Sequence, residues 1–275
     1  MAESVPSCPT VSAAEPPPGD RANAAAAAIA ELRARFEEFD WYHTQELAPG
    51  IVTPGMFDLR GYVDHYGIPQ DLSGMRVLEV GTFEGFWAFE LERRGADVTA
   101  IDIDRIQQLD WPPRLRPSED RQRGGAFALL AQARGSSVKR VGMSIYDANP
   151  EALGGRFDLV FCGSVLIHLR DPMLALERMA ELCRGELILC EEYAKSFGLF
   201  RRPGGGAEFR GESPWSVWWV PTTRTWEAMV RCAGFESVRR HRTFKMRFRA
   251  APGGVPHVVV HAAAAAKPGS IEPAE

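Results

Sequence analysis

The sequence predicts an α/β fold built around a mostly parallel β-sheet, and three observations lead to this prediction. From Arg76 onward, short apolar stretches typical of buried strands alternate with longer amphipathic stretches. A glycine turn over residues 81–85 joins the first such strand to the first helix. The composition is that of a globular protein, because 45% of the 275 residues are hydrophobic and 25% are charged. A chain of this length can bury one large core.

The elements follow in a regular order. We expect strands at 76–80, 97–101, 138–142, 157–162, 186–191, 235–249 and 255–262. Helices are expected at 84–94, 119–134, 171–184 and 222–233. Strands that alternate with helices in this way pair in parallel and are covered on both faces. The prediction is therefore a Rossmann-like, mostly parallel sheet of seven strands with helices on both faces.

The residues before this unit predict a helical lid. Residues 22–39 carry apolar side chains at helical spacing, and a further helix is expected at 58–66. The domain prediction has four parts: a disordered tail at 1–20, the lid at 21–71, the main domain at 72–262 and a second disordered tail at 263–275. Within the main domain, an insertion at 196–220 is expected to cap the substrate, since long insertions after strand ends lie where ligands bind.

Charge and cysteine content exclude several classes of protein. The net charge of −4 provides no global field that would favour nucleic acid. Five cysteines, with no C-x-x-C pair, argue against a disulfide framework and a zinc site, so a cytoplasmic location is expected. No apolar run approaches 18 residues, so no membrane span is expected.

The glycine turn and the strand after it predict a nucleotide-type ligand. Asp102 ends the second strand 23 residues after Glu79, where an acid can accept hydrogen bonds from ribose hydroxyl groups. The turn differs from a dinucleotide site, because Glu84 would repel a phosphate and Phe83 would crowd it. A sulfonium cofactor that carries an ammonium group tolerates such acids.

Four motifs in this order resemble the class I S-adenosylmethionine-dependent methyltransferases. They are Glu79 to Gly85, Asp102, the Ser144-Ile145-Tyr146-Asp147 stretch, and Phe157-Asp158-Leu159-Val160-Phe161. The resemblance implies that Gly81 and Gly85 pass the amino-acid end of S-adenosylmethionine, that Asp102 binds both ribose hydroxyl groups and that Asp147 binds the adenine amino group. One departure is Phe83, where the family usually has glycine.

The full set of expected cofactor-binding residues comprises the turn, the acids after the strands and the residues beside them: Glu79, Gly81, Thr82, Phe83, Gly85, Asp102, Ile103, Tyr146, Asp147 and Gly163. Ile103 and Tyr146 would form walls of the adenosine site, and each is alternatively an ordinary core residue. Asp147 is alternatively a helix N-cap.

A narrower resemblance links the chain to the branch of methyltransferases related to the tRNA wobble-uridine modifiers of the uridine-5-oxyacetate pathway. It is carried by Trp41-Tyr42-His43 with the glycines that follow, and by Leu166-x-His168-Leu169-x-Asp171-Pro172. The acidic balance of the chain departs from the tRNA enzymes, so this resemblance guides the fold and cofactor rather than the substrate.

The candidates for catalysis are His168, Glu191 and His43. His168 follows the fourth strand and is the first candidate for a general base. Glu191 and Glu192 end the fifth strand, and only one of two adjacent strand residues can face the pocket. His43 lies in the predicted lid. For His168 the alternative is a structural hydrogen bond to a neighbouring backbone carbonyl.

The substrate contacts are expected in the insertion. Trp215, Trp218 and Trp219 can form an apolar wall with polar N–H tips, and Arg201 can reach an anionic group. The alternatives for the tryptophans are a small separate core or a homodimer face, which leaves the oligomeric state open. The basic run at 239–249 would bind RNA phosphates or, alternatively, form the solvated edge of a closing strand.

These observations predict a methyltransferase that uses S-adenosylmethionine and, as the first hypothesis, O-methylates a small molecule such as a secondary metabolite. A tRNA wobble-uridine modifying transferase is the second hypothesis. A non-catalytic nucleotide-binding module with the same fold is the third. No metal site is expected.

Overall fold

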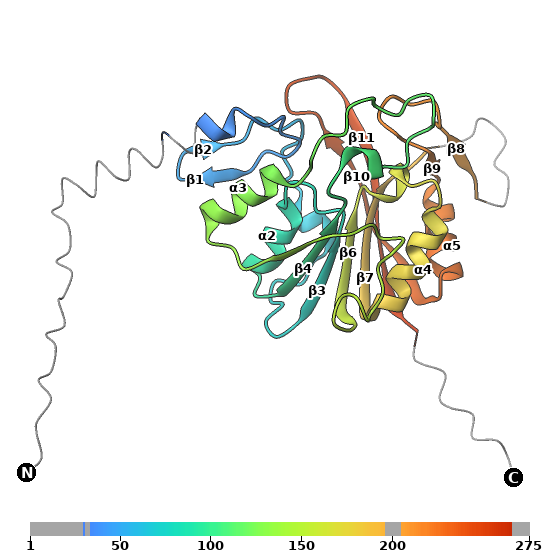
Figure 1. The fold of residues 1–275 in the computed structure, drawn as a ribbon. Helices are drawn as coiled ribbons and strands as arrows, with labels where there is room; N and C mark the ends of the chain where they lie inside the picture. Colours follow the sequence, from blue (N-terminus) through green and yellow to red (C-terminus); the bar gives the residue numbers. More distant parts are fainter. Residues whose placement is uncertain (1–29, 31–33, 196–204, 266–275) are drawn as a thin grey trace, which may run out of the picture. The chain divides into compact units, whose positions relative to one another are not determined.

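The computed structural model describes residues 30, 34–195 and 205–265. Its central element is a seven-stranded sheet in the order β10-β11-β7-β6-β3-β4-β5 (Figure 1). The strands are β3 (Arg76–Val80), β4 (Asp97–Asp102), β5 (Lys139–Gly142), β6 (Phe157–Gly163), β7 (Cys183–Glu192), β10 (Phe235–Arg247) and β11 (Gly254–Ala264). β3 to β7 pair in parallel, whereas β11 is antiparallel to both of its neighbours. The predicted mostly parallel sheet of seven strands is therefore confirmed.

Helices cover both faces of this sheet (Figure 1). On one face, α4 (Pro172–Leu182) and α5 (Thr223–Cys232) join a buried cluster that includes Val160 and Leu189. On the other face, α2 (Phe86–Arg93) places Trp87 against Phe161, with 4.9 Å between the ring centroids. Beside α2 lies α3 (Gly125–Arg134), whose Phe127 stacks on Phe89 at 5.1 Å. Burial on both faces explains the near-continuous apolar character of the inner strands.

Local sequence signals fix several helix ends. The Asp171 side chain accepts a hydrogen bond from the Leu174 amide and caps α4, which has Pro172 in its first turn. α3 begins at Gly125, six residues after the predicted start. The residues just before α3 pair with the loop after β4 and are not helical. The Ile106 amide donates to the Arg121 carbonyl at 2.9 Å, and the Arg123 amide donates to the Asp104 carbonyl at 2.8 Å.

The front segment, residues 40–71, differs from the predicted helical lid. A hairpin of β1 (Glu46–Ala48) and β2 (Ile51–Val52) comes first, and the helix predicted at 58–66 is only a 3-10 helix, η1 (Val63–Tyr66). Tyr66 of η1 is 2% exposed and packs inward, since its ring centroid lies 4.1 Å from that of Trp87 and 5.6 Å from that of Phe244. Most of the helix predicted at 22–39 and the tail at 1–20 lie outside the described residues, although positions 30 and 34–36 are helical.

The topology places a ligand crevice at one edge of the sheet. The chain runs from β3 outward through β4 and β5 and then returns to β6 on the other side of β3. In open α/β sheets, ligands bind at this switch point, outside the carboxyl ends of the strands. Three further elements follow strands at this edge or border it: η2 (Ile106–Gln108), η3 (Leu166–His168), and the hairpin of β8 (Ala207–Phe209) and β9 (Trp219–Pro221). In the described part of the chain, no helix is both long enough and apolar enough to cross a membrane.

Candidate functional site

The glycine turn follows the carboxyl end of β3 and requires its glycines. Gly81 has φ +76°, and a Cβ there would lie 2.3 Å from Cγ2 of Val165. Gly85 has φ +86°, and a Cβ would meet the ring of Phe89 at 2.5 Å. Both positions therefore need a residue without a side chain. Phe83 also has a positive φ, +48°, which is a strained backbone for a residue other than glycine.

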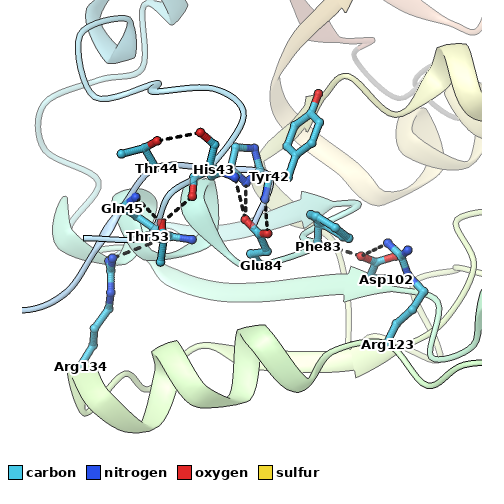
Figure 2. A network of polar contacts seen from close by, with 11 residues as sticks. Tyr42, His43, Thr44, Gln45, Thr53, Phe83, Glu84, Asp102, Arg123 and Arg134 are labelled. Atoms are coloured by element: carbon cyan, nitrogen blue, oxygen red, sulfur yellow. Dashed lines mark hydrogen bonds and ion pairs between the residues drawn. The ribbon is translucent and has the colours of Figure 1, made fainter. Parts of the chain in front are cut away.

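Asp102 ends β4 beside this turn (Figure 2). Its Oδ2 accepts a hydrogen bond from the Phe83 amide at 2.7 Å, and its Oδ1 accepts one from the Ile103 amide at 2.8 Å. Nη2 of Arg123 lies 3.6 Å from Oδ2. Each carboxylate oxygen can accept more than one hydrogen bond, so Asp102 retains acceptor capacity for ribose hydroxyl groups.

Two carboxyl groups are buried below the crevice. Glu79 is 2% exposed, and its Oε2 and the hydroxyl of Thr82 have no hydrogen-bond partner among the described residues. Burial raises the pKa of Glu79 to about 8. Glu191 is fully buried, and its Oε1 accepts from the amides of Val165 and Leu166 at 2.9 and 2.8 Å. Burial raises the pKa of Glu191 to about 8 as well. Through the two amide hydrogen bonds, this candidate catalytic residue holds the start of η3.

Glu84 fixes the front segment to the glycine turn (Figure 2). Its Oε1 accepts from the Tyr42 amide at 2.6 Å, and its Oε2 accepts from the His43 amide at 2.9 Å. The His43 ring lies against Phe86 at 5.5 Å, with Nδ1 3.2 Å from Oε2 of Glu84. His43 is thus part of the contact that anchors the front segment to the glycine turn. The sequence indicated only that Glu84 would repel phosphate, since nothing local connects it with residues 41 positions earlier.

Asp110 is a site residue that sequence reasoning missed. Its Oδ2 accepts from the Tyr146 hydroxyl and from the Arg170 amide, both at 2.7 Å. Its backbone carbonyl accepts from the Trp218 indole at 2.6 Å, and the Arg170 carbonyl accepts from the Trp219 indole at 3.2 Å. Asp110 therefore links the loops after β4, β5 and β6 to the predicted substrate cap. No motif marks it.

The remaining catalytic and substrate candidates do not lie together in one place. His168 ends η3 beneath the cap, where its Nδ1 lies 3.4 Å from the Ser216 carbonyl oxygen, and burial lowers its pKa. Trp215 is 72% exposed, unlike Trp218 and Trp219. Arg201 lies outside the described residues.

Three predicted cofactor residues take different positions. Ile103 is buried next to Asp102, and Gly163 ends β6. Asp147 is exposed in a turn after β5, where its amide donates to the Ser144 carbonyl at 3.1 Å, and it caps no helix among the described elements. The turn and Asp102 are thus brought together directly, whereas Asp147 has no such link.

Most of the basic run lies on β10, one of the two edge strands of the sheet, and Arg249 follows that strand. Arg240 pairs with Glu227 at 2.7 Å, and Arg249 donates to the carbonyls of Pro54 and Gly55. The side chains of Arg242, Lys245 and Arg247 are exposed and form no ion pair with any described residue. Part of the run is therefore structural and part faces solvent.

Comparison with known proteins identifies the family. Residues 59–240, more than half of the chain, match the family model described as a methyltransferase domain. The chain belongs to the class I S-adenosylmethionine-dependent methyltransferases. Its cofactor is S-adenosylmethionine, as predicted.

Curated relatives and solved structures agree with this family. The chain is 35% identical over 105 residues to magnesium-protoporphyrin O-methyltransferase of Rhodobacter capsulatus, which is 38% of each protein. It is 27% identical over 183 residues to ubiquinone biosynthesis O-methyltransferase of Cereibacter sphaeroides, which is 62% of this chain and 64% of the relative. The chain therefore spans less than two thirds of these relatives. The N-terminal domain of EvdMO1, solved with S-adenosylhomocysteine and D-fucose, shares the fold at 20% identity and a TM-score of 0.56, over 86% of this chain and 97% of that domain.

The residues at the turn fit this methyltransferase cofactor. Gly81 and Gly85 let the turn pack closely on Val165 and Phe89, where a Cβ would clash, and this close packing fixes the backbone of the turn at the end of β3. The unpartnered oxygens of Glu79 and Thr82 provide acceptors for an ammonium group. Asp102 provides acceptors for hydroxyl groups beside them. Together these groups suit a nucleoside that carries an amino-acid chain.

Proposed function

We propose that this methyltransferase transfers the methyl group of S-adenosylmethionine to a hydroxyl oxygen of a small molecule, such as a secondary metabolite. The observation that carries the proposal is a set of hydrogen bonds that hold two segments beside the carboxyl end of the sheet. Glu84 fixes the front segment to the glycine turn, and Asp110 ties the loop after β4 to the cap at Trp218. Segments held beside a site in this way favour a small acceptor over a macromolecule. The two O-methyltransferase relatives support oxygen as the acceptor atom.

The chain's own residues mainly position the reactants. When bound, S-adenosylmethionine supplies an activated methyl group. Asp102 would hold the ribose, and Glu79 with Thr82 would hold the amino-acid end. In-line transfer needs the acceptor oxygen about 3 Å from the methyl carbon, so positioning provides much of the rate gain.

We propose that His168 is the general base that takes the proton from the hydroxyl group of the methyl acceptor. Because burial lowers its pKa, the imidazole is neutral near pH 7 and can accept a proton. The Ser216 carbonyl lies 3.4 Å from Nδ1, which favours the tautomer that leaves Nε2 as the basic atom. Glu191 would act through the backbone of Val165 and Leu166, as a positioning residue.

The proposal is tested in two steps. Calorimetric titration with S-adenosylhomocysteine should show binding to the purified protein. Radiolabelled S-adenosylmethionine is then incubated with a panel of phenols, catechols and carboxylic acids, and methylated products are counted. Binding without transfer to any panel member would contradict the small-molecule proposal and favour a non-catalytic module.

A tRNA wobble-uridine modifying transferase is the second candidate, and the exposed cations on β10 favour it. Arg242, Lys245 and Arg247 could neutralise phosphates along that edge. Binding of bulk tRNA should then weaken steeply as salt rises from 50 to 200 mM, since counterions are released. Methyl transfer to tRNA but to no panel compound would replace the first proposal by this one.

A further inference from the structure

A serine–histidine pair lies at the carboxyl end of β6, outside the roles assigned above. Ser164 directly follows Gly163, and its Oγ lies 3.0 Å from Nε2 of His257 in β11. Its amide donates to the Cys190 carbonyl at 2.7 Å. Ser164 has φ +57°, a left-handed backbone that residues other than glycine rarely adopt. The surrounding contacts therefore hold this serine in one orientation.

The direction of the hydrogen bond in this pair is fixed by the other side of the imidazole. Nδ1 of His257 lies 3.1 Å from the Val255 carbonyl oxygen, and a carbonyl can only accept, so Nδ1 carries the hydrogen. His257 is 2% exposed and its ring stacks on Phe244, and burial lowers its pKa to about 4. The ring is thus neutral near pH 7, and Nε2 is an acceptor.

The Ser164 hydroxyl must then donate its single proton to Nε2 of His257. What remains on the serine oxygen is acceptor capacity alone. A hydroxyl that rotates freely can bind donors or acceptors, but this one can bind only a donor. The pair therefore converts an ordinary serine into a selective acceptor.

The position of Ser164 places this acceptor beside the glycine turn. β6 is the neighbour of β3 in the sheet, and the crevice opens where these two strands end. The next residue, Val165, fills the space that Gly81 leaves by lacking a Cβ. Ser164 is half-buried at this strand end, on the edge of the sheet where the crevice opens.

We propose that the Ser164 hydroxyl accepts a hydrogen bond from a second, non-reacting hydroxyl group of the methyl acceptor, and that His257 is a positioning residue that keeps Ser164 from donating. This inference rests on the proposed O-methylation, in which the proton of the reacting hydroxyl goes to His168. The bond to Ser164 orients the acceptor, and orientation of this kind contributes to the rate of transfer. A compound whose second oxygen carries a methyl group lacks that hydrogen and loses the bond, so the site selects acceptors with two hydroxyl groups.

The test uses catechol and its monomethyl ether as probes, with the protein saturated by S-adenosylhomocysteine. Wild type should bind catechol about tenfold more tightly than the ether, the effect of one hydrogen bond of ordinary strength. Ser164→Ala should abolish that preference and leave the dissociation constant of S-adenosylhomocysteine unchanged within about twofold. Ser164→Gly relieves the backbone strain and should behave like Ser164→Ala, which separates loss of the hydroxyl from misfolding.

Three results would overturn the proposal. The first is a wild type that does not distinguish the two probes, and the second is a Ser164→Ala variant that still does. The third is a Ser164→Ala variant that loses S-adenosylhomocysteine, since Ser164 would then serve the cofactor. Nitrogen-15 spectra of His257 provide a readout independent of turnover, because the ring should remain a neutral Nδ1–H tautomer at pH 7. Absence of S-adenosylhomocysteine binding in wild type would instead contradict the proposed function itself.

Discussion

Glu84 offers the sharpest test of how the front segment is held over the site. The carboxylate is 1% exposed and accepts two backbone amides, those of Tyr42 and His43. Glu84→Ala leaves both N–H groups without a partner, at about 1–3 kcal/mol each where water cannot reach them. The Tyr42 amide is only partly buried, so we expect a total loss of about 2–4 kcal/mol in the free energy of unfolding. Glu84→Gln keeps one acceptor oxygen and should lose roughly half as much.

The measurements are urea denaturation and amide hydrogen exchange. Exchange should accelerate at Tyr42 and His43, and at Gln45 and Thr53, which are hydrogen-bonded within the same segment. Glu181→Ala is the control, because Glu181 forms an exposed pair with Arg178 and should change stability by less than about 0.5 kcal/mol. If Glu84→Ala were as mild as this control, with unchanged exchange at residues 42 and 43, the anchoring role would be refuted.

Three further predictions concern the cofactor and the transfer step. Asp102→Ala should weaken S-adenosylhomocysteine binding by about 1–3 kcal/mol in calorimetry, and an unchanged dissociation constant would show that Asp102 does not bind the ribose. His168→Ala should lower kcat about 10²-fold at unchanged cofactor affinity, whereas full activity would leave His168 with a structural role. Glu79 has a pKa raised from 4.5 to about 8 in the folded protein, so its contribution to stability is complete below pH 4.5 and is lost as pH rises through about 8. Glu79→Gln should remove this part of the pH dependence of cofactor-free unfolding, and a wild-type-to-variant difference that is constant with pH would contradict it.

The fold was predictable because its signals are local. Strand and helix periodicity located the seven strands of the sheet and α2, α4 and α5 within a few residues, and α3 except for its start, while caps such as Asp171 mark helix ends in the sequence itself. The helix expected at 58–66 failed for a tertiary reason. Tyr62 and Tyr66 pack against Phe244, which lies about 180 residues further along the chain, and those contacts favour the shorter 3-10 helix η1.

The site was predictable only where it is contiguous. Gly81, Gly85 and Asp102 belong to one strand–turn–helix–strand unit, and the structure joins them through the Phe83 amide. Ser164 and His257 are 93 residues apart and in no motif, so only the sheet order brings them together. Asp110 was missed for the same reason, since its partners lie on three other loops.

Phe83 shows how a departure from a family pattern can be functional. Its backbone adopts a glycine-like φ of +48°, which costs about 1–2 kcal/mol for an L-residue. Glycine would remove that cost but also the ring, which lies 4.8 Å below the Arg123 guanidinium and 5.9 Å from the ring of Tyr42, edge-on. Cation–π and edge-to-face contacts contribute about 0.5–1.5 kcal/mol each, enough to offset the strain. Because Tyr42 belongs to the front segment and Arg123 to the loop after β4, the Phe83 ring contacts both of these segments at the glycine turn. The ring of Phe83 therefore helps to hold the front segment and the loop after β4 together at the turn.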